Sequence, residues 1–448
     1  MPVADHVLRH AGDRPAIRGP HGELSYGELA EKINGAARHL LGQGAGPGSL
    51  VGIGVADPVA LLVAVLAADL AGATPLVGDH AWDRRRWARM AAVDVLVDAP
   101  LPYVRGPAVD HEPAPGDRAW ACFSSGSTGR PRAVVRTRAS WTASFPHLGD
   151  LAGITPGDVV LVPGPLASSL YAFAALHALA TGATAVVPGR SPAASFAEHL
   201  EDATVVHVVP HLLPAVLARP GALRTAVVGG AALGPQARAA AARAGVRVVS
   251  YYGATELSFV AVDADGGELR PFPGVEIEVR PVAGSMLGEV WARSPWLAEG
   301  YLGGAAGPLR RDGDGWMTVG DVAHPYEAGQ VLRLRGRGDG AIQTGGATVV
   351  PEDVEEVLRK VPGVGDIVVI GSPHPSLGSV VTAILEADGA PPPRALLEAV
   401  ARSGLDVAQR PRRWYAVPSL PRTRAGKPAR ALVAARLAGG DPDIRRLT

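Results

Sequence analysis

The segment from residue 123 to residue 132 reads Phe123-Ser124-Ser125-Gly126-Ser127-Thr128-Gly129-Arg130-Pro131-Arg132. It has the composition of a phosphate-binding loop, because glycines let the backbone approach an anion while hydroxyl and amide groups donate hydrogen bonds to its oxygens. It is not a Walker A loop, since no Gly-Lys-Ser/Thr follows at the required spacing. Taken alone, these residues would also fit a flexible Ser/Gly turn on the surface.

The chain around this segment alternates apolar strands with helices. Ser25 and Glu28 have the spacing of a capping box before an amphipathic helix, and Asp57 followed by Pro58 marks the start of another. Strands followed by helices are predicted at 50–55, 158–162, 204–209 and 225–228. This alternation predicts an α/β fold with parallel layers that are covered on both faces.

The length of 448 residues favours a large domain and a small one. Alternating strands and Gly-rich turns replace the long α/β units near Glu289 and after Leu332, which indicates a β-rich subdomain. We predict a large N-terminal domain of layered α/β subdomains over residues 1–336 and a small mobile α+β domain over residues 337–448. The small domain should contain a helix from Pro351, strands at 366–370 and 380–385, and a helix near 394–401.

The composition is that of a soluble globular protein, with 47% hydrophobic residues, 19% charged residues and a formal net charge of zero. A neutral chain is a poor partner for nucleic acid. The uncharged run 159–189 is interrupted by prolines and glycines, so we expect strand, loop, buried helix and strand, and no membrane span. The absence of an apolar segment near Asp5 and the single Cys122 predict a cytoplasmic location without disulfides.

Lysine is rare in this chain. The 43 basic residues include only Lys32, Lys360 and Lys427, and Lys427 lies in a loop beside a glycine. A lysine ammonium is a compact point charge on a flexible stem, whereas an arginine guanidinium is a fixed planar fork. We therefore regard Lys427 as a candidate for a site that needs an ammonium group.

The segment Ser124-Ser125-Gly126-Ser127-Thr128-Gly129, with Pro131 after it, resembles the phosphate-loop signature of the adenylate-forming (ANL) superfamily of acyl- and aryl-CoA ligases, peptide-synthetase adenylation domains and luciferases. Five more segments resemble the family's motifs in the same order: Gly229-Gly230-Ala231, Tyr252-Gly253-Ala254-Thr255-Glu256, Gly320-Asp321, Gly336-Arg337-Gly338-Asp339 with Gly345-Gly346 and Pro351, and Pro421-Arg422-Thr423 through Gly426-Lys427. Each motif alone is weak, but together they extend over most of the chain.

The resemblance implies a site for ATP and its product AMP. Its nucleotide-binding residues would be Ser124, Ser125, Gly126, Ser127, Thr128, Gly129, Gly229, Gly230, Ala231, Tyr252, Gly253, Ala254, Thr255, Asp321, Arg337 and Lys427. Glu256 and Thr128 would hold Mg²⁺, a hard ion that prefers oxygen ligands. Catalysis would rest on Lys427, Thr128, Glu256 and Arg337, because a carboxylate must approach a triphosphate while negative charge builds on its oxygens.

The resemblance also implies a second step, in which a thiol attacks the acyl carbon after the small domain has rotated. Asp339 corresponds to the family's hinge, and the glycines beside it would accommodate a large change of φ and ψ. Gly345 and Gly346 would approach the thiol channel, and coenzyme A would supply the thiol. Three positions depart from the family pattern: Arg132 and Gln343 replace a usual lysine, and Ser168 stands where many ligases have an aromatic residue or histidine.

The substrate pocket would be mostly apolar. Its candidate residues are Ser168, Leu170, Tyr171, His211, Ala254, Ser258, Phe259 and Val260. His207 and His211 would contact a second polar group of the substrate, or else have a structural role. Residues 159–189 contain no carboxylate that could pair with an α-ammonium group, which disfavours an amino acid and favours an aryl or medium-sized acyl acid.

Three readings of the function follow. The first is an acid–CoA ligase, and the second is a stand-alone adenylation enzyme that serves a carrier protein in trans or an amine. The third is a nucleotide-binding regulator without catalysis. Monomer and homodimer both remain open.

Overall fold

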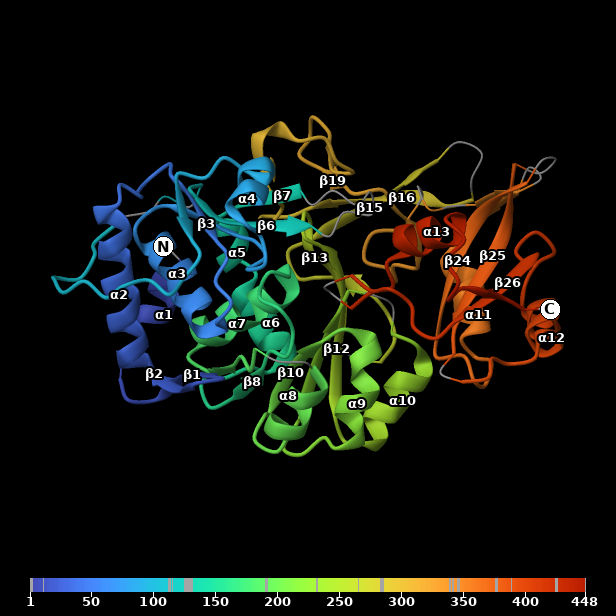
Figure 1. Cartoon of the computed structure of the whole chain (residues 1–448), viewed down its shortest axis with the longest axis horizontal. Helices are drawn as coiled ribbons and strands as arrows, with labels where there is room; N and C mark the ends of the chain where they lie inside the picture. The colour runs from blue at the N-terminus through green and yellow to red at the C-terminus, as the bar shows by residue number, and fades with distance from the viewer. Residues whose placement is uncertain are drawn as a thin grey trace. The chain divides into compact units, whose positions relative to one another are not determined.

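The computed structural model describes residues 3–10, 12–111, 114, 116–124, 132–189, 192–230, 233–264, 266–282, 286–337, 340, 342–344, 347–374, 378–387, 389–423 and 426–447 (Figure 1). The chain divides into two compact units. Unit 1 comprises Met1–Ser125, Pro131–Glu276 and Arg293–Leu309, and unit 2 comprises Gly126–Arg130, Ile277–Ala292 and Arg310–Thr448. We describe each unit by itself.

Unit 1 contains two sheets and most of the helices. Its helices are α1 Val3–Leu8, α2 Tyr26–Gly42, α3 Pro58–Leu70, α4 Arg84–Met90, α5 Arg138–Thr142, α6 Phe145–Ala152, α7 Ser169–Thr181, α8 Pro192–His199, α9 Leu213–Ala218 and α10 Pro235–Arg243. Its strands are β1 Pro15–Gly19, β2 Gly22–Ser25, β3 Leu50–Ile53, β4 Thr74–Val77, β5 Val95–Val97, β6 Arg118–Ser124, β7 Arg132–Thr137, β8 Val159–Leu161, β9 Thr184–Val186, β10 Val205–Val208, β11 Thr225–Gly229, β12 Arg247–Ala254, β13 Ser258–Asp263, β14 Arg270–Pro271 and β17 Gly300–Tyr301.

The larger sheet has the order β14-β13-β12-β11-β10-β8-β9-β1-β2, and the second has the order β17-β7-β6-β4-β3-β5. Strands β8 to β12 pair in parallel, and so do β3, β4, β5 and β6. Antiparallel strands β13, β7 and β17 lie toward the edges. The predicted α/β fold with parallel layers is therefore confirmed.

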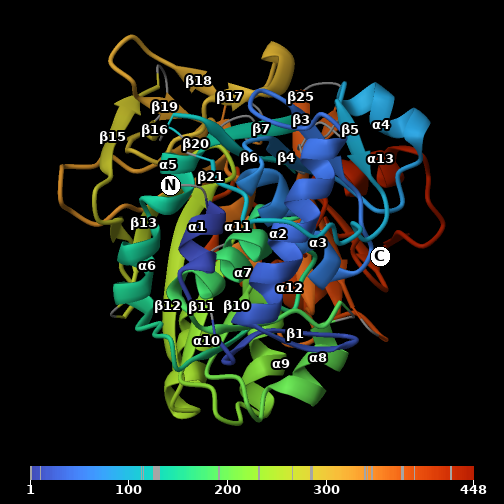
Figure 2. The same cartoon turned by 90° about the vertical axis from the view of Figure 1, so that its left-hand side faces the viewer.

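Local sequence signals account for the helix starts. Ser25 Oγ accepts the N–H of Glu28 at 3.2 Å, and the Glu28 carboxylate accepts the N–H of Ser25 at 2.8 Å, which is the predicted capping box of α2. Asp57 caps α3, with Pro58 in its first turn. Helix α3 packs against α2 (Figure 2). Its residues from Leu61 to Leu70 are buried.

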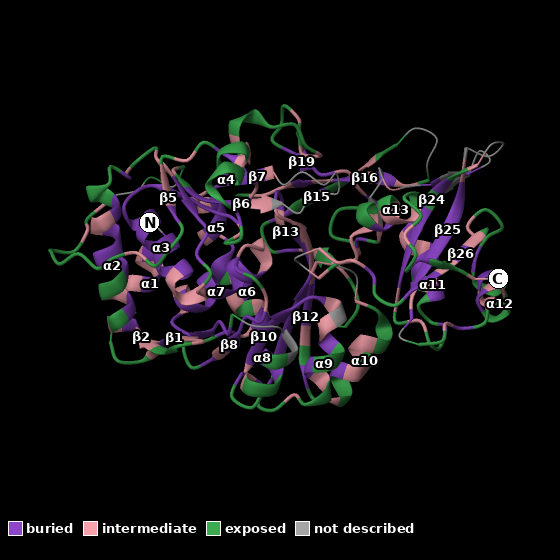
Figure 3. Ribbon diagram, viewed as in Figure 1, coloured by how far each residue is buried: buried purple, intermediate pink, exposed green. Residues whose placement is uncertain are grey.

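Helices cover both faces of the larger sheet (Figures 1 and 3). Apolar residues of α8 and α9, such as Phe196 and Leu213, pack on alternate residues of β10 and β11. Helix α7 packs on β8, β9 and β10, and its residues from Tyr171 to Leu179 are buried. The run 159–189 is thus strand, loop, buried helix and strand, as predicted. No helix within the described ranges is long and apolar enough to cross a membrane.

Unit 2 contains two further sheets and three helices among its described residues. Its strands are β15 Glu276–Pro281 and β16 Gly288–Arg293, which begin or end in unit 1, and β18 Arg310–Arg311, β19 Met317–Thr318, β20 Asp321–Ala323, β21 Leu334–Arg337, β22 Ile342–Thr344, β23 Ala347–Val349, β24 Asp366–His374, β25 Gly378–Glu386, β26 Arg413–Val417 and β27 Arg445–Arg446. Its helices are α11 Pro351–Leu358, α12 Arg394–Gly404 and α13 Arg430–Ala438.

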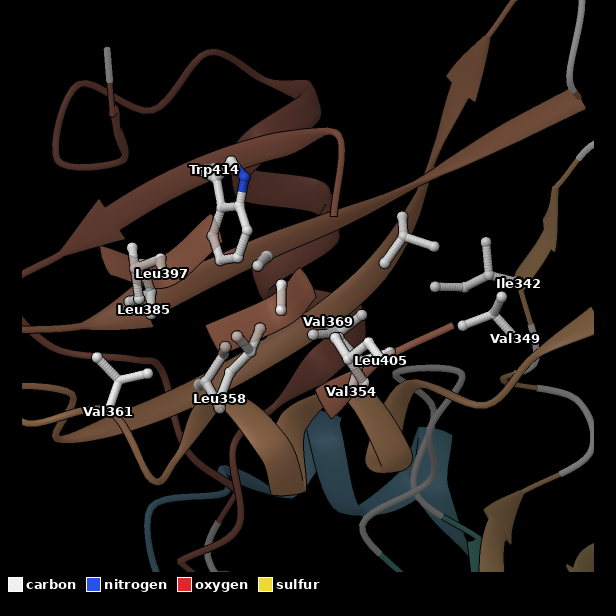
Figure 4. Close-up of a cluster of buried hydrophobic side chains, with 14 residues drawn as sticks. Ile342, Val349, Val354, Leu358, Val361, Val369, Leu385, Leu397, Leu405 and Trp414 are labelled. Atoms are coloured by element: carbon white, nitrogen blue, oxygen red, sulfur yellow. The ribbon is translucent and has the colours of Figure 1, made fainter. Parts of the chain in front are cut away.

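The C-terminal sheet of unit 2 carries apolar cores on its two faces. One core joins Val354 and Leu358 of α11 to Val369 of β24, Leu397 of α12 and Trp414 of β26 (Figure 4). The other joins Val433 of α13 to Val368, Ile370 and Ile384. Alternation along β24 therefore separates the face under α11 from the face under α13. The predicted helix from Pro351, the two strands and the helix near residue 394 are confirmed.

Candidate functional site

The predicted phosphate loop joins two adjacent strands. Strands β6 and β7 are antiparallel, and the last pair of their register is Ser124 with Arg132. The Arg132 side chain donates from Nε to the carbonyl oxygen of Ala306 at 2.6 Å, so it contacts a neighbouring segment. Residues Ser125, Gly126, Ser127, Thr128 and Gly129 lie outside the described residues, as does the side chain of Ser124.

The neighbouring candidate motif begins where β11 ends. Gly229 is opposite Tyr251 of β12, and a Cβ on Gly229 would lie 2.2 Å from the Tyr251 ring. Only glycine fits at this position, because that distance is far shorter than the usual separation of two non-bonded carbon atoms. Gly230 follows with a φ of +94°, and Ala231 lies outside the described residues.

A tight turn places the most polar residues of the motif at the end of β12. Strand β12 ends at Ala254, and β13 returns from Ser258, which has a φ of +57°. A Cβ on Gly253 would lie 2.0 Å from the carbonyl oxygen of Ser258, so the two strands approach each other more closely than any side chain allows. Thr255 and Glu256 occupy this turn.

Glu256 is a buried carboxylate with a hydroxyl donor. The residue is 5% exposed, and Tyr301 donates its hydroxyl to Oε1 of Glu256 at 2.8 Å. Tyr301 belongs to β17, which pairs with β7, the strand that follows the phosphate loop. Burial raises the pKa of Tyr301, and the Glu256 charge adds to this, so Tyr301 remains a donor at neutral pH.

Two other side chains hold the same turn. The hydroxyl oxygens of Thr255 and Ser169 are 3.0 Å apart, which links the turn to the start of α7. Arg136, 4% exposed, donates to the carbonyl oxygens of Trp296 and Ser140 at 2.6 Å and of Thr255 at 3.4 Å. Burial lowers the pKa of Arg136 to about 10, so its guanidinium stays charged at neutral pH and interacts with the charge of Glu256.

Tyr301, Arg136 and Ser169 are absent from the residues predicted from the sequence. Nothing in the local sequence of Gly300 and Tyr301 marks a partner of Glu256, because the contact depends on the pairing of β17 with β7. Arg136 follows the apolar run from Ala133 to Val135 in β7, and a charged residue directly after buried neighbours was the one available signal.

The predicted substrate residues divide into turn and helix positions. Ser168 is the N-cap residue of α7, while Ala254 and Ser258 flank the Thr255 turn. The Tyr171 ring is 2% exposed and fills the space beside Gly164, where a Cβ would lie 2.0 Å from it. Burial raises the pKa of Tyr171 to about 12.

The remaining candidate wall residues lie in the core or cannot be placed. Phe259 and Val260 are buried, and Phe259 contacts the rings of Tyr251, Phe173 and Phe272. His207 is also buried, and burial lowers its pKa to about 3, which favours the structural role for this histidine. The side chain of His211 lies outside the described residues.

The other predicted residues belong to unit 2. Asp321 starts β20 opposite Arg337 of β21, and the N–H of Gly320 donates to Oγ1 of Thr318 at 3.1 Å. Lys427 is exposed on a short hairpin before α13. Asp339, Gly345 and Gly346 lie outside the described residues, and so do the side chains of Arg337 and Gln343.

The described residues fit magnesium better than a transition metal. They contain no group of three or more His, Cys, Asp and Glu side chains that could hold a metal ion by themselves. Magnesium is commonly bound by one or two carboxylates together with phosphate oxygens and water. A single buried carboxylate such as Glu256 suits that arrangement.

Models of two protein families match the chain. The model described as AMP-binding enzyme matches residues 3–96 and 89–302, and the model described as AMP-binding enzyme C-terminal domain matches residues 353–427. A probable 2-succinylbenzoate–CoA ligase of Mycobacterium tuberculosis is 34% identical over 358 residues, which cover 72% of this chain and 85% of that protein.

Two other similar proteins differ in the products that their names describe. The salicyl-AMP ligase / salicyl-S-ArCP synthetase of Mycobacterium tuberculosis is 28% identical over 491 residues and covers 94% of this chain and 86% of its own length. The structure of the amide bond synthetase McbA from Marinactinospora thermotolerans has a TM-score of 0.81 and 27% identity, and covers 97% of this chain and 99% of that one.

The close approach at Gly253 generates a prediction about stability. Gly253→Ala should lower the free energy of unfolding by about 1–3 kcal/mol, because the added methyl group must displace the Ser258 carbonyl. Urea unfolding measures the change. Gly42→Ala is the control, since Gly42 lies in α2 with open space around it and alanine is a better helix former. Equal unfolding midpoints for the two variants would show that the turn tolerates a side chain.

Proposed function

The chain belongs to the AMP-binding enzyme family, and we propose that it uses ATP to convert a carboxylic acid to an acyl-adenylate and then transfers the acyl group to the thiol of coenzyme A. The observation that carries the proposal is the turn at Thr255 and Glu256. It buries a carboxylate whose hydroxyl donor, Tyr301, lies in the strand next to β7, and β7 begins where the phosphate loop ends.

In the proposed first step, an oxygen of the substrate carboxylate attacks the α-phosphorus of ATP and pyrophosphate leaves. Two anions must approach each other, so cations and hydrogen-bond donors have to offset their charge. The phosphate loop and Thr255 would donate to phosphate oxygens, and Asp321 would accept from the ribose hydroxyls. Glu256 and Thr128 would hold Mg²⁺, which supplies positive charge beside the phosphates.

Lys427 and Arg337 would provide the remaining positive charge. The Lys427 ammonium suits a site in which negative charge moves between the substrate carboxylate and the α-phosphate, because it imposes no planar geometry on its partner. Arg337 would meet the ribose or a phosphate.

In the proposed second step, the thiol sulfur attacks the acyl carbon, its proton is lost and AMP leaves. Lys427 would occupy the space that the thiol needs, so the small domain, residues 337–448, would rotate about Asp339 between the steps. Gly345 and Gly346 would then line the thiol channel.

The substrate is proposed to be an aryl or medium-sized acyl acid without an α-ammonium group. Residues 159–189 contain no carboxylate, and Asp158 just before them is engaged by Arg224 at 2.7 Å and by the Thr204 hydroxyl at 2.7 Å. Ser168, Tyr171, His211, Ala254 and Ser258 would line the pocket. An ammonium group buried among such residues would lack a partner charge.

A second candidate function is adenylation for another acceptor. Two similar proteins favour it, since their names describe an S-linked ArCP product and an amide bond. A regulator that binds nucleotide without catalysis is the third reading, and the combination of a buried Glu256 with its donor Tyr301 argues against it.

The decisive experiment is a panel of carboxylic acids, including benzoate, salicylate, 2-succinylbenzoate and hexanoate, incubated with ATP and Mg²⁺ with and without coenzyme A. Release of pyrophosphate with formation of an acyl-CoA supports the proposal. Adenylate formation that ignores coenzyme A would favour the carrier-protein or amine acceptor. No pyrophosphate from any acid would favour the regulator.

The role of Lys427 can be separated from that of other lysines. Lys427→Ala should slow adenylate formation by at least about 100-fold, because it removes the charge that stabilises the transition state. It should leave thiol transfer from supplied benzoyl-adenylate largely intact. Lys360→Ala, which removes another exposed lysine of unit 2, is the control and should change neither step. Equal loss of both steps in Lys427→Ala would contradict the assigned role.

Tyr301→Phe tests whether Glu256 holds the metal. Loss of the hydroxyl should weaken binding of Mg²⁺–ATP about tenfold, because a ligating carboxylate loses the donor that orients it. Isothermal titration calorimetry measures the dissociation constant, and the difference should disappear when ATP is titrated with EDTA present. Tyr326→Phe is the control. A loss that persists with EDTA would assign Tyr301 to nucleotide binding rather than to the metal.

Asp339→Pro tests the hinge. Proline fixes φ at one value, so the variant should form the adenylate at the normal rate and transfer it to coenzyme A at least about tenfold more slowly. Single-turnover measurement of the two steps separates these effects. Full product formation by the variant would show that rotation about residue 339 is not needed.

A further inference from the structure

Lys427 lies on a short hairpin, which we call the lysine hairpin and define by the described residues 421–423 and 426–430. Its backbone hydrogen bonds run from Thr423 N to Lys427 O at 2.7 Å and from Ala429 N to Pro421 O at 2.7 Å, with Arg422 and Pro428 paired between them. A two-stranded hairpin of this length is marginally stable by itself. Contacts with other parts of unit 2 must therefore hold the hairpin in place.

Arg422 fixes the first strand of the hairpin to the sheet. Its NH1 donates to Asp366 Oδ2 at 3.0 Å, and its NH2 donates to Glu386 Oε1 at 3.1 Å. Asp366 and Glu386 are directly opposite each other in the register of β24 and β25. Like charges in that arrangement destabilise a sheet, so the guanidinium between them neutralises a repulsion that is built into the strand pairing. The same NH1 also donates to Gly426 O at 3.3 Å, inside the hairpin.

Arg430 fixes the other end of the hairpin. Its NH1 donates to Glu355 Oε1 and to the carbonyl oxygen of Val369, both at 2.5 Å, and its NH2 donates to Glu352 Oε1 at 2.8 Å. Glu355 is 3% exposed and also accepts the N–H of Val369 at 2.8 Å. Arg430 therefore connects the end of the hairpin to α11 and to the middle of β24.

We propose that Arg422 and Arg430 are positioning residues that hold the two ends of the lysine hairpin and so fix the backbone from which Lys427 extends. Ordering a lysine at a reacting site costs entropy from its backbone and from its four side-chain torsions, and a backbone that is already fixed removes the first of these costs. Reaction rates fall steeply when a charged group is displaced from the reacting atoms. The inference rests on the proposed function in one respect only, which is that Lys427 acts in the formation of the acyl-adenylate.

Hydrogen exchange of the full-length chain tests the positioning without any substrate. In Arg422→Gln and in Arg430→Gln, the backbone amides of Thr423, Gly426 and Ala429 should exchange about tenfold faster, because each variant loses charged hydrogen bonds that close the hairpin. Arg436→Gln is the matched control. Arg436 lies on α13, is similarly half-buried and pairs with Asp441 rather than with the hairpin.

The amides of β24 and β25 report whether the variants fold. Arg422→Gln/Glu386→Gln removes one of the two opposed carboxylates together with the arginine, so no like-charge pair is left opposite in the strands. This variant should keep the strand pairing and still show the faster exchange in the hairpin. Unchanged exchange of the hairpin amides in all of these variants would overturn the proposal. Faster exchange spread evenly over β24 and β25 would also overturn it, because the arginines would then stabilise the sheet alone.

A second measurement connects the hairpin to catalysis. With benzoate as the probe acid, Arg422→Gln and Arg430→Gln should slow pyrophosphate release about tenfold or more and leave thiol transfer from supplied benzoyl-adenylate within about twofold of the unmodified chain. Arg430→Lys, which retains one charged donor, should recover part of the loss. Equal slowing of both steps would overturn the proposed effect on Lys427. If the unmodified chain released no pyrophosphate from any acid, the proposed function would fail, while hydrogen exchange would still decide the positioning.

Discussion

A buried carboxylate constrains much of unit 1. Glu256 is almost inaccessible to water, and an ionised group in such a place needs hydrogen bonds and nearby positive charge. Its donor, Tyr301, belongs to the second sheet, while Glu256 itself follows a strand of the larger sheet. Arg136 contributes a buried positive charge and binds the backbone at Thr255. The two sheets of unit 1 are thereby connected at the turn that carries Thr255 and Glu256.

The sequence predicted the parts of this arrangement that depend on local chemistry. The capping box at Ser25, the buried helix within 159–189 and the α/β layers follow from spacing and burial patterns, and the structure confirms them. The tight turn that holds Glu256 was not predicted, although Gly253, whose missing side chain allows the close approach to Ser258, belongs to the motif. Tyr301 and Arg136 could not be predicted, because their contacts depend on the pairing of strands that are far apart in the chain. The phosphate loop and the hinge segment are known only from their sequences.

The arginines and the lysine of the lysine hairpin have different surroundings. Arg422 and Arg430 each contact two carboxylates, which suits the planar fork of a guanidinium. Lys427, between them, is exposed on the hairpin that they hold. The chain uses arginine for nearly all of its positive charge, and Lys427 is one of its three lysines. In the proposal above, the two arginines hold the ends of the hairpin and Lys427 supplies the ammonium group that extends from it.

The pair formed by Glu355 and Arg430 has a consequence for the outer edge of β24. On the side of β24 away from β25, the N–H of Val369 is bound by Glu355 and its carbonyl oxygen is bound by Arg430. The two side chains occupy the hydrogen-bonding positions that a strand from another molecule would use. Within the described part of the chain β24 pairs only with β25, and an open strand edge of this kind invites intermolecular β-pairing and aggregation. Arg430, which binds the end of the lysine hairpin, and Glu355 thus leave this N–H and this carbonyl oxygen of β24 no longer open to a strand from another molecule.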